Sequence, residues 1–348
     1  MVITISKKPT LREIALLTNT SINTVSRALN AKHGVSEKTR KYIEQVAIEN
    51  NYRPNLLARS MRGNNTNLLG IIVGDIGNTF FVQLLEGVGD IAKKENMTIA
   101  IGNSAESAEE EAKNVDVFLS YQCAGLAISP VSDSSSIINC LKDENVNFVV
   151  LDRPLPEGIE CDHVSINNER DSFRATEYLI TCGHRDIAII APSRYPTEQD
   201  RYSGYRKALE KHAIPLNQEY VKFCDNKHNV RQICREILTL EKRPTAIFVA
   251  LELLSLGVIS AVSEFGLKIP EDLSIIVYGD PEWASVFSPP LTCMQRPVRE
   301  MGQIGASILI NRTKSSAGKR KTNPAVPLFK GISLDSKLMI RESVRIIL

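Results

Sequence analysis

The chain has 348 residues, more than twice the length of an ordinary domain of about 150 residues, so its length favours two or three domains. Hydrophobic residues make up 43% and charged residues 24% of the sequence, which excludes the disordered class. The net charge of +2 is uneven, because residues 1–62 carry 11 Lys or Arg against 4 Asp or Glu, a charge of +7. The remainder is acidic at −5. A basic segment indicates nucleic acid or another anionic partner, although solvent-exposed helices are often basic as well.

The cysteine pattern and the hydropathy pattern indicate a cytoplasmic protein. Seven cysteines include no C-x-x-C pair, so neither a disulfide framework nor a zinc site is expected. The first ten residues lack the apolar run of a signal peptide, and the longest apolar stretch, residues 248–262, is interrupted by Glu252. Unpaired thiols persist in a reducing cytoplasm, where we expect the protein to act.

Three short helices are predicted in the basic segment. Thr10 to Glu13 has the form of a capping box and starts a first helix of about eight residues. Ser21 can cap a second helix, and Ser36 opens a third that runs to about Asn50. This is the layout of a helix-turn-helix, whose second helix enters the major groove of DNA.

The second helix directs three side chains outward that are suited to reading base edges. Asn23 can pair with adenine, Arg27 with guanine, and Ile22 can meet a thymine methyl group. A single exposed Asn or Arg is ordinary helix surface, so the argument depends on the three residues sharing one face before a basic third helix. We expect contacts with the DNA backbone from Thr10, Ser21, Thr24, Ser26, Asn30, His33, Lys38, Asn55 and Arg59.

Residues 10–30, residues 35–40 and the segment YRPNLLARSMR at residues 52–62 resemble the lactose/galactose repressor family. In that family a hinge helix follows the Pro-Asn pair and inserts an apolar side chain into the minor groove. The resemblance puts this wedge on Met61, beside Arg62, although a methionine in a linker can also pack on a neighbouring domain. A helix of about seven residues is shorter than the roughly 12–15 needed for marginal stability, so we expect it to fold only on DNA.

From Leu68 onward, short apolar runs alternate with helical stretches. Strands are predicted at residues 68–73, 98–101, 125–128 and 148–151, and then at 187–190, 220–223, 246–249 and 274–277. Helices are predicted near 80–95, 106–120, 134–145, 169–182, 200–212, 229–239 and 252–265. The pattern favours an α/β class with two doubly wound, periplasmic-binding-protein-like lobes after the all-α head, and a ligand cleft between them.

The family resemblance continues to the end of the chain, for example in residues 75–81, 183–185 and 338–343. It implies a ligand-responsive transcription regulator. We expect a DNA-binding domain at 1–62 with its hinge helix at about 54–62, a linker at 63–67, and a sensing domain at 68–348. The expected lobes are 68–163 with 293–323, and 164–290 with 324–348.

The effector site is where the sequence departs from the family pattern. An Asp-Asn pair reads Asn167-Asn168, an Asn-Asp pair reads Leu251-Glu252, and an aspartate reads Gly279. On the family resemblance, we expect the ligand to contact Asp75, Phe80, Phe81, Asn167, Tyr195, Thr197, Arg201, Asn226, Leu251, Asp280 and Trp283.

Four of these residues carry the argument about the ligand. Arg201 can clamp a carboxylate, a phosphate or a sugar hydroxyl, Asp280 can accept hydroxyl hydrogens, and Trp283 can stack on a sugar. The alternatives are core packing for Trp283 and a turn for Asp280. Neutral Asn167 lowers the negative charge around Arg201, which favours a sugar acid or sugar phosphate over a neutral sugar.

The sequence motifs give little support to an enzymatic function. Gly87 to Ala92 matches G-x-G-x-x-A, but it lies inside a predicted helix about thirteen residues after the strand, where no pyrophosphate would meet the glycines. We therefore expect no cofactor, metal or catalytic residue. The expected protein is a homodimeric repressor that binds a pseudo-palindromic operator, and five residues after Ser343 leave no room for a tetramerising tail. The alternatives are a cytoplasmic sugar sensor that acts without DNA and a sugar-modifying enzyme.

Overall fold

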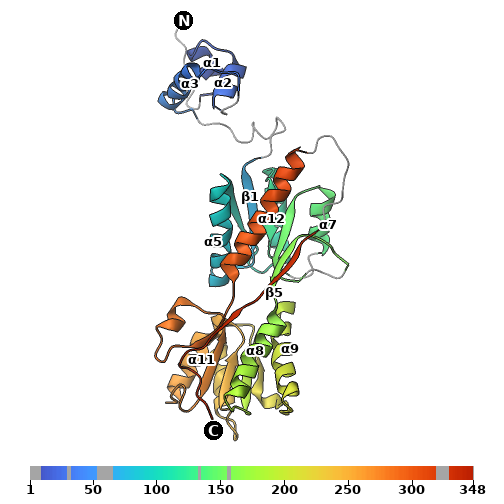
Figure 1. The fold of residues 1–348 in the computed structure, drawn as a ribbon, viewed down its shortest axis with the longest axis vertical. Helices are drawn as coiled ribbons and strands as arrows, with labels where there is room; N and C mark the ends of the chain where they lie inside the picture. Colours follow the sequence, from blue (N-terminus) through green and yellow to red (C-terminus); the bar gives the residue numbers. More distant parts are fainter. Residues whose placement is uncertain are drawn as a thin grey trace. The chain divides into compact units, whose positions relative to one another are not determined.

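The computed structural model describes residues 9–29, 33–52, 66–131, 135–154, 158–318 and 329–347. The chain divides into two compact units, Met1–Thr66 and Asn67–Leu348, which are drawn in Figure 1. The expected hinge helix at about 54–62 lies outside the described residues. Within the described ranges, no helix combines the length and the apolar character that a membrane span requires.

The first unit contains three helices, α1 (Leu11–Leu17), α2 (Ile22–Leu29) and α3 (Glu37–Glu49). The capping box at Thr10 is confirmed, because its hydroxyl accepts from the Glu13 amide and its own amide donates to the Glu13 carboxylate. Ser21 and Ser36 cap the next two helices by accepting from backbone amides at 3.0 and 3.2 Å. The helices bury a small apolar core made of Ile14, Ala15, Val25, Ala28 and Ile43.

The second unit contains two six-stranded sheets, each covered by helices, which confirms the expected α/β class with two doubly wound lobes (Figure 1). The first sheet has the order β11-β5-β4-β3-β1-β2 and is parallel throughout. Its strands are β1 (Leu68–Val73), β2 (Thr98–Asn103), β3 (Gly125–Ile128), β4 (Phe148–Asp152), β5 (His163–Ile166) and β11 (Gly331–Leu334). Its helices are α5 (Thr79–Lys94), α6 (Ala108–Ser120), α7 (Ser135–Asp143) and α12 (Val298–Gly318).

The second sheet has the order β12-β10-β9-β8-β6-β7, and only the edge pair of β10 with β12 is antiparallel. Its strands are β6 (Ile187–Ala191), β7 (Val221–Phe223), β8 (Ala246–Val249), β9 (Ser274–Tyr278), β10 (Thr292–Gln295) and β12 (Lys337–Met339). Its helices are α8 (Asn168–Thr181), α9 (Pro196–Lys211), α10 (Val230–Leu238) and α11 (Glu252–Glu264), with short 3₁₀ turns at Gln218–Tyr220 and Glu282–Ser285.

The lobe boundaries differ from those expected. The chain crosses between the lobes after β5, after β10 and after β11, so residues 164–166 and 331–334 belong to the first lobe and residues 293–295 to the second. Strands β5, β10, β11 and β12 were not predicted, and neither was α12. These strands have three or four residues each, and such short segments become strands only through the neighbours with which they pair.

The glycines of the G-x-G-x-x-A segment serve helix packing. Gly87 lies in α5 against α12, where an added Cβ would collide with the Arg299 carbonyl, and Gly302 of α12 approaches the Leu84 carbonyl in the same way. Gly89, two residues along α5, has open space around it. The segment therefore sets the contact between the two helices, and its place within α5 rules out a phosphate-binding turn.

We expect Gly87→Ala to lower the free energy of unfolding by about 1–3 kcal/mol, because the new methyl group forces α5 away from the α12 backbone. The matched control is Gly89→Ala, which should raise it by about 0.5–1 kcal/mol because alanine favours the helix. Urea unfolding followed by circular dichroism measures both values. Equal effects of the two substitutions would contradict the close helix contact.

Candidate functional site

The outer face of α2 is exposed and polar. Ile22 is 44% exposed, and Asn23 and Arg27 are also exposed, whereas Val25 and Ala28 on the opposite face are buried. Of the expected backbone contacts, Ser21, His33 and Lys38 are exposed, and Thr10 uses its hydroxyl in the capping box. Asn30, Asn55, Arg59, Met61 and Arg62 lie outside the described residues.

The absence of a side chain at Gly34 leaves space for the Arg27 side chain at the end of this face. The φ of +96° at Gly34 lies in the left-handed region that favours glycine, and an added Cβ would lie 3.0 Å from a guanidinium nitrogen of Arg27. The turn after α2 therefore leaves the Arg27 side chain space beside the helix. An exposed Asn and Arg one turn apart on one helix face can present hydrogen-bond donors and acceptors to base edges in a groove.

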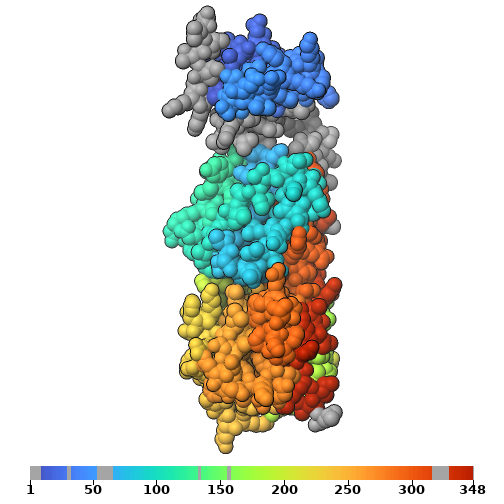
Figure 2. Space-filling view, turned by 90° about the vertical axis from the view of Figure 1, so that its left-hand side faces the viewer, coloured from blue at the N-terminus to red at the C-terminus, as the bar shows by residue number. Residues whose placement is uncertain are grey.

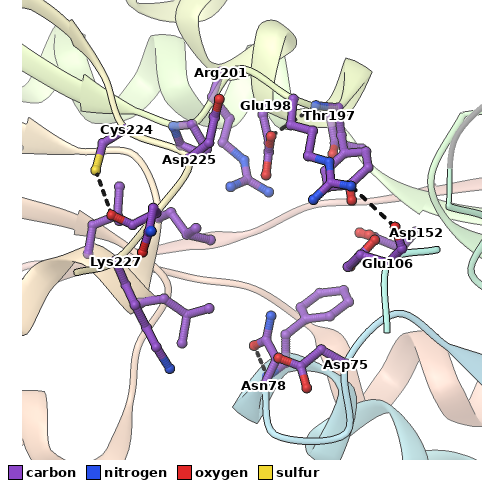
Figure 3. A pocket seen from close by; sticks show the side chains of 18 of the residues that line it. Asp75, Asn78, Glu106, Asp152, Thr197, Glu198, Arg201, Cys224, Asp225 and Lys227 are labelled. Atoms are coloured by element: carbon purple, nitrogen blue, oxygen red, sulfur yellow. Dashed lines mark hydrogen bonds between the residues drawn. The ribbon is translucent and has the colours of Figure 1, made fainter. Parts of the chain in front are cut away.

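A second candidate site is a cavity of about 440 Å³ between the two lobes (Figure 3). Its walls are built by the segments that follow the carboxyl ends of strands in both sheets, which is where ligands bind in doubly wound folds. The structure brings eight of the eleven expected contact residues into this lining, namely Asp75, Phe80, Phe81, Tyr195, Thr197, Arg201, Asn226 and Leu251.

Arg201 lies on α9 and is 4% exposed, with its guanidinium held from two sides. Its Nε donates to Asn168 Oδ1 and one terminal nitrogen donates to the Ala250 carbonyl, both at 3.0 Å. The ring of Tyr278 lies 4.5 Å from the guanidinium carbon, and the Tyr278 hydroxyl also donates to Asn168. The other terminal nitrogen, Nη2, finds no hydrogen-bond partner in the described part of the chain. This fixed edge of Arg201 is available to a ligand.

Asp152, at the end of β4, is a lining residue that the sequence analysis missed. Its φ of +70° turns the chain sharply at the strand end, and burial raises the pKa of its carboxyl group. Within the described ranges, this carboxylate accepts no hydrogen bond, although Arg153, Arg201 and Arg296 act on it electrostatically. The Asp152-Arg153 pair after an apolar run was the available signal, because side chains at that point of a parallel strand face the cleft.

Arg153 is committed to the protein itself. It donates to both oxygens of Glu106 at 2.7 and 2.8 Å and to the carbonyls of Pro130 and Val131. Its guanidinium carbon lies 3.9 Å from the ring centre of Tyr195, which belongs to the other lobe. Arg153 therefore connects the two lobes at the cleft. Most of its N–H groups already donate to the protein, which leaves few hydrogen bonds for a ligand.

The opposite wall of the cavity is apolar. Phe80 and Phe81 at the start of α5 pack edge to face with their ring centres 5.2 Å apart, and both are nearly buried. Leu251 and Leu254 extend this wall from the second lobe. The cavity thus pairs an apolar wall with a polar wall that includes the free edges of the Asp152 carboxylate and the Arg201 guanidinium.

Three expected contact residues lie away from this cavity. The Asp280 carboxylate makes a paired contact with Arg341 at 2.7 and 2.9 Å, so it anchors the C-terminal segment. Trp283 packs on the apolar core of the second lobe and meets Phe287, which corresponds to the core-packing alternative. Asn167 caps α8 by accepting from the Arg170 amide at 3.0 Å.

The position of Asn167 removes the argument for an anionic ligand. That expectation assumed that a neutral residue replaces a carboxylate beside Arg201, but Asn167 is exposed and outside the lining. The cavity carries five carboxyl groups, Asp75, Glu106, Asp152, Glu198 and Asp225, and five arginines or lysines, Arg153, Arg194, Arg201, Lys227 and Arg296. The charge lining the cavity is balanced, apart from the contribution of His228.

Comparison with known proteins assigns a family to each part of the chain. Residues 10–55 match the family "Bacterial regulatory proteins, lacI family", and residues 176–334 match "Periplasmic binding protein-like domain". The chain is 30% identical to the ribose operon repressor of Haemophilus influenzae, over 96% of this chain and 98% of the relative. It is 30% identical to the transcriptional repressor PurR of Vibrio campbellii, over 90% of this chain and 94% of the relative.

Two solved structures are similar over nearly the whole chain. A Lac repressor dimer bound to operator and an anti-inducer shares 25% identity at a TM-score of 0.84, covering 97% of this chain and all of that one. The complex of the transcriptional regulator CelR with cellobiose shares 26% identity at a TM-score of 0.69, with the same coverage. Head and lobes therefore occur together in these relatives, as they do here.

We expect Asp280→Ala to lower the free energy of unfolding by about 3 kcal/mol, because it leaves the half-buried Arg341 without its carboxylate. Asp90→Ala is the matched control, since Asp90 makes the same paired contact with Arg299 at an exposed site. That control should change stability little. Urea midpoints of the two variants measure the difference, and a stable Asp280→Ala protein would show that the pair is not an anchor.

Proposed function

Because this chain belongs to the LacI family of bacterial regulatory proteins, we propose that it is a transcriptional repressor whose binding to operator DNA is controlled by a small ligand. The observation that carries the proposal is the exposed α2 face of Ile22, Asn23 and Arg27 on a basic head, joined to a two-lobed unit with a polar cavity. A sensor that acts without DNA is not favoured, because the similarity to repressors includes the head. A regulator of transcription works where the chromosome lies, which in bacteria is the cytoplasm.

On DNA, Ile22, Asn23 and Arg27 read base edges in the major groove, and Lys38 and His33 approach the phosphates. The basic charge of residues 1–62 supplies affinity that depends on salt, whereas the α2 side chains supply sequence preference. Met61 and Arg62 remain our prediction for the minor-groove wedge. This division of roles gives each residue a distinct signature in binding experiments.

The ligand of the cavity is a neutral hydroxylated molecule with one apolar face, a description that fits a sugar. Asp152 accepts hydrogen bonds from its hydroxyl groups, and the free edge of Arg201 donates to its oxygens. The rings of Phe80 and Phe81 cover the apolar ring face. A balanced lining charge favours a neutral sugar over a sugar acid or a sugar phosphate.

The functional form is a homodimer on a pseudo-palindromic operator. The second unit exposes large apolar side chains, with Leu256 61% and Val286 82% exposed, and Ile101 on the edge strand β2 is 49% exposed. A contact with a second copy would cover such apolar surface if these residues lie in one patch. A second copy is the occupant we propose, because a similar repressor was solved as a dimer on operator. Two-fold symmetry of the protein requires matching half-sites in the DNA.

We expect Arg27→Ala to relax base preference at one position of each half-site, because about 1–3 kcal/mol of discrimination is lost there. Lys38→Ala is the matched comparison, since it removes a positive charge without removing a base contact. It should weaken binding to all sequences similarly and reduce the salt slope by about 1. Binding-site selection followed by gel shifts at several salt concentrations measures both effects. Unchanged base preference in Arg27→Ala would refute the role of the α2 face.

Thermal unfolding with neutral sugars, sugar acids, sugar phosphates and purines tests the ligand. Neutral sugars should raise the melting temperature, since a ligand at 100 times its Kd stabilises a protein by about 2.7 kcal/mol. Asp152→Asn and Arg201→Lys should both reduce this gain, because each alters one free polar edge of the cavity. Stabilisation by phosphorylated sugars alone would overturn the assignment to a neutral ligand.

A further inference from the structure

Two departures from the family pattern, at Leu251-Glu252 and at Gly279, meet at one place in the structure. Gly279 follows β9 with a φ of +117°, and a Cβ added there would collide with the Glu252 carboxylate. The Glu252 side chain therefore occupies the space that any side chain at position 279 would need.

The Glu252 carboxylate joins three segments of the chain. One oxygen accepts a hydrogen bond from the hydroxyl of Thr79, the first residue of α5 in the first lobe. The other accepts from Arg296 at 2.9 Å, on the crossover between β10 and α12. Glu252 itself begins α11 in the second lobe. The Glu252 and Arg296 side chains are only 7% and 5% exposed, so water screens the ion pair little.

Arg296 extends the connection to the aromatic wall of the cavity. Its guanidinium carbon lies 4.7 Å from the ring centre of Phe80 in the first lobe and 5.5 Å from that of Tyr278 in the second. Moving the lobes apart would take Thr79 and Phe80 away from the Glu252–Arg296 pair. Opening thus costs a hydrogen bond to a charged group and the contact of a cation with an aromatic ring.

We propose that Glu252 is an internal strut that holds the two lobes together in the ligand-free protein. Its charge is satisfied by Thr79 and Arg296, and it lies outside the cavity lining, so it supports closure in place of contacting the ligand. The free edges of Asp152 and Arg201 are then among the polar groups that the cavity offers to a ligand.

The strut also sets ligand affinity, a consequence that rests on the proposed function. A ligand that binds the closed lobes has an apparent affinity proportional to the closed population. Because Glu252 keeps the closed population high, little of the binding free energy of the ligand is used to close the cleft. Removing the strut should weaken ligand binding by the factor by which the closed population falls.

Hydrogen exchange of the full-length, ligand-free protein tests the strut directly. Thr79→Val removes only the hydrogen bond between the lobes, and Glu252→Ala removes both contacts. In each variant we expect amide exchange in residues 79–84 and 252–258 to accelerate, by about tenfold or more in Glu252→Ala, because local opening becomes more frequent. Exchange at wild-type rates in both variants would overturn the proposal.

Glu264→Ala is the matched control. Glu264 lies at the other end of α11 and pairs with Arg231 and Arg235 of α10, within a single lobe. Its loss should leave exchange in residues 79–84 unchanged, and equal acceleration there would show that no strut specific to Glu252 exists. If Glu252→Ala does not fold because Arg296 is left buried and unpaired, Thr79→Val decides the question, since it keeps that ion pair.

The proposed function and the role of Glu252 are tested by different experiments, so either can be refuted alone. A wild-type protein that selects no DNA sequence would refute the repressor assignment, whereas the exchange experiment uses neither DNA nor ligand. Unchanged exchange in the variants refutes the strut even when operator binding is intact.

Discussion

Parallel strands bring all their carboxyl ends to one edge of a sheet, and in this protein both sheets contribute that edge to one cavity (Figure 3). Figure 2 shows the cyan surface of the first lobe meeting the yellow and orange surface of the second. The loops after these strands cannot pair with one another as strands do, so their polar side chains are left to meet in the cleft. Three crossovers tie the two sheets together at this level. The ligand site, the strut and the coupling between lobes all depend on this geometry.

Within the cleft, the arginines differ in how far carboxylates of the protein neutralise their charge. Arg153 is neutralised by Glu106 and Arg296 by Glu252, each through buried or half-buried contacts. Removing one partner of such a pair lowers the free energy of unfolding strongly, because the other charge is left unpaired in a medium of low dielectric constant. Arg201 differs, because amide and carbonyl oxygens hold it without cancelling its charge. A cleft that satisfies most of its own charges leaves recognition to a few groups.

Regulation requires that a change in the cleft alter how the head meets DNA. A coupling free energy of about 1–3 kcal/mol changes operator affinity about 5- to 150-fold, which a few hydrogen bonds between lobes can supply. A hydrogen bond to a charged group, such as the one from Thr79 to Glu252, contributes on the order of 1.5–3 kcal/mol. The hinge helix expected at about residues 54–62 remains our prediction for the element that the lobes influence.

The sequence by itself determined the local elements: the capping box at Thr10, the strand at residues 68–73 and the alternating helices each follow from neighbouring residues. Together with the family resemblance, it also placed eight of the residues that line the cavity. Only the tertiary structure decided the rest. The short crossover strands exist through their partners, and Asp280 and Trp283 turn away from the cleft because Arg341 and the second core hold them. The Glu252 contacts join residues 173 positions apart, a separation at which sequence pattern carries no information about contact.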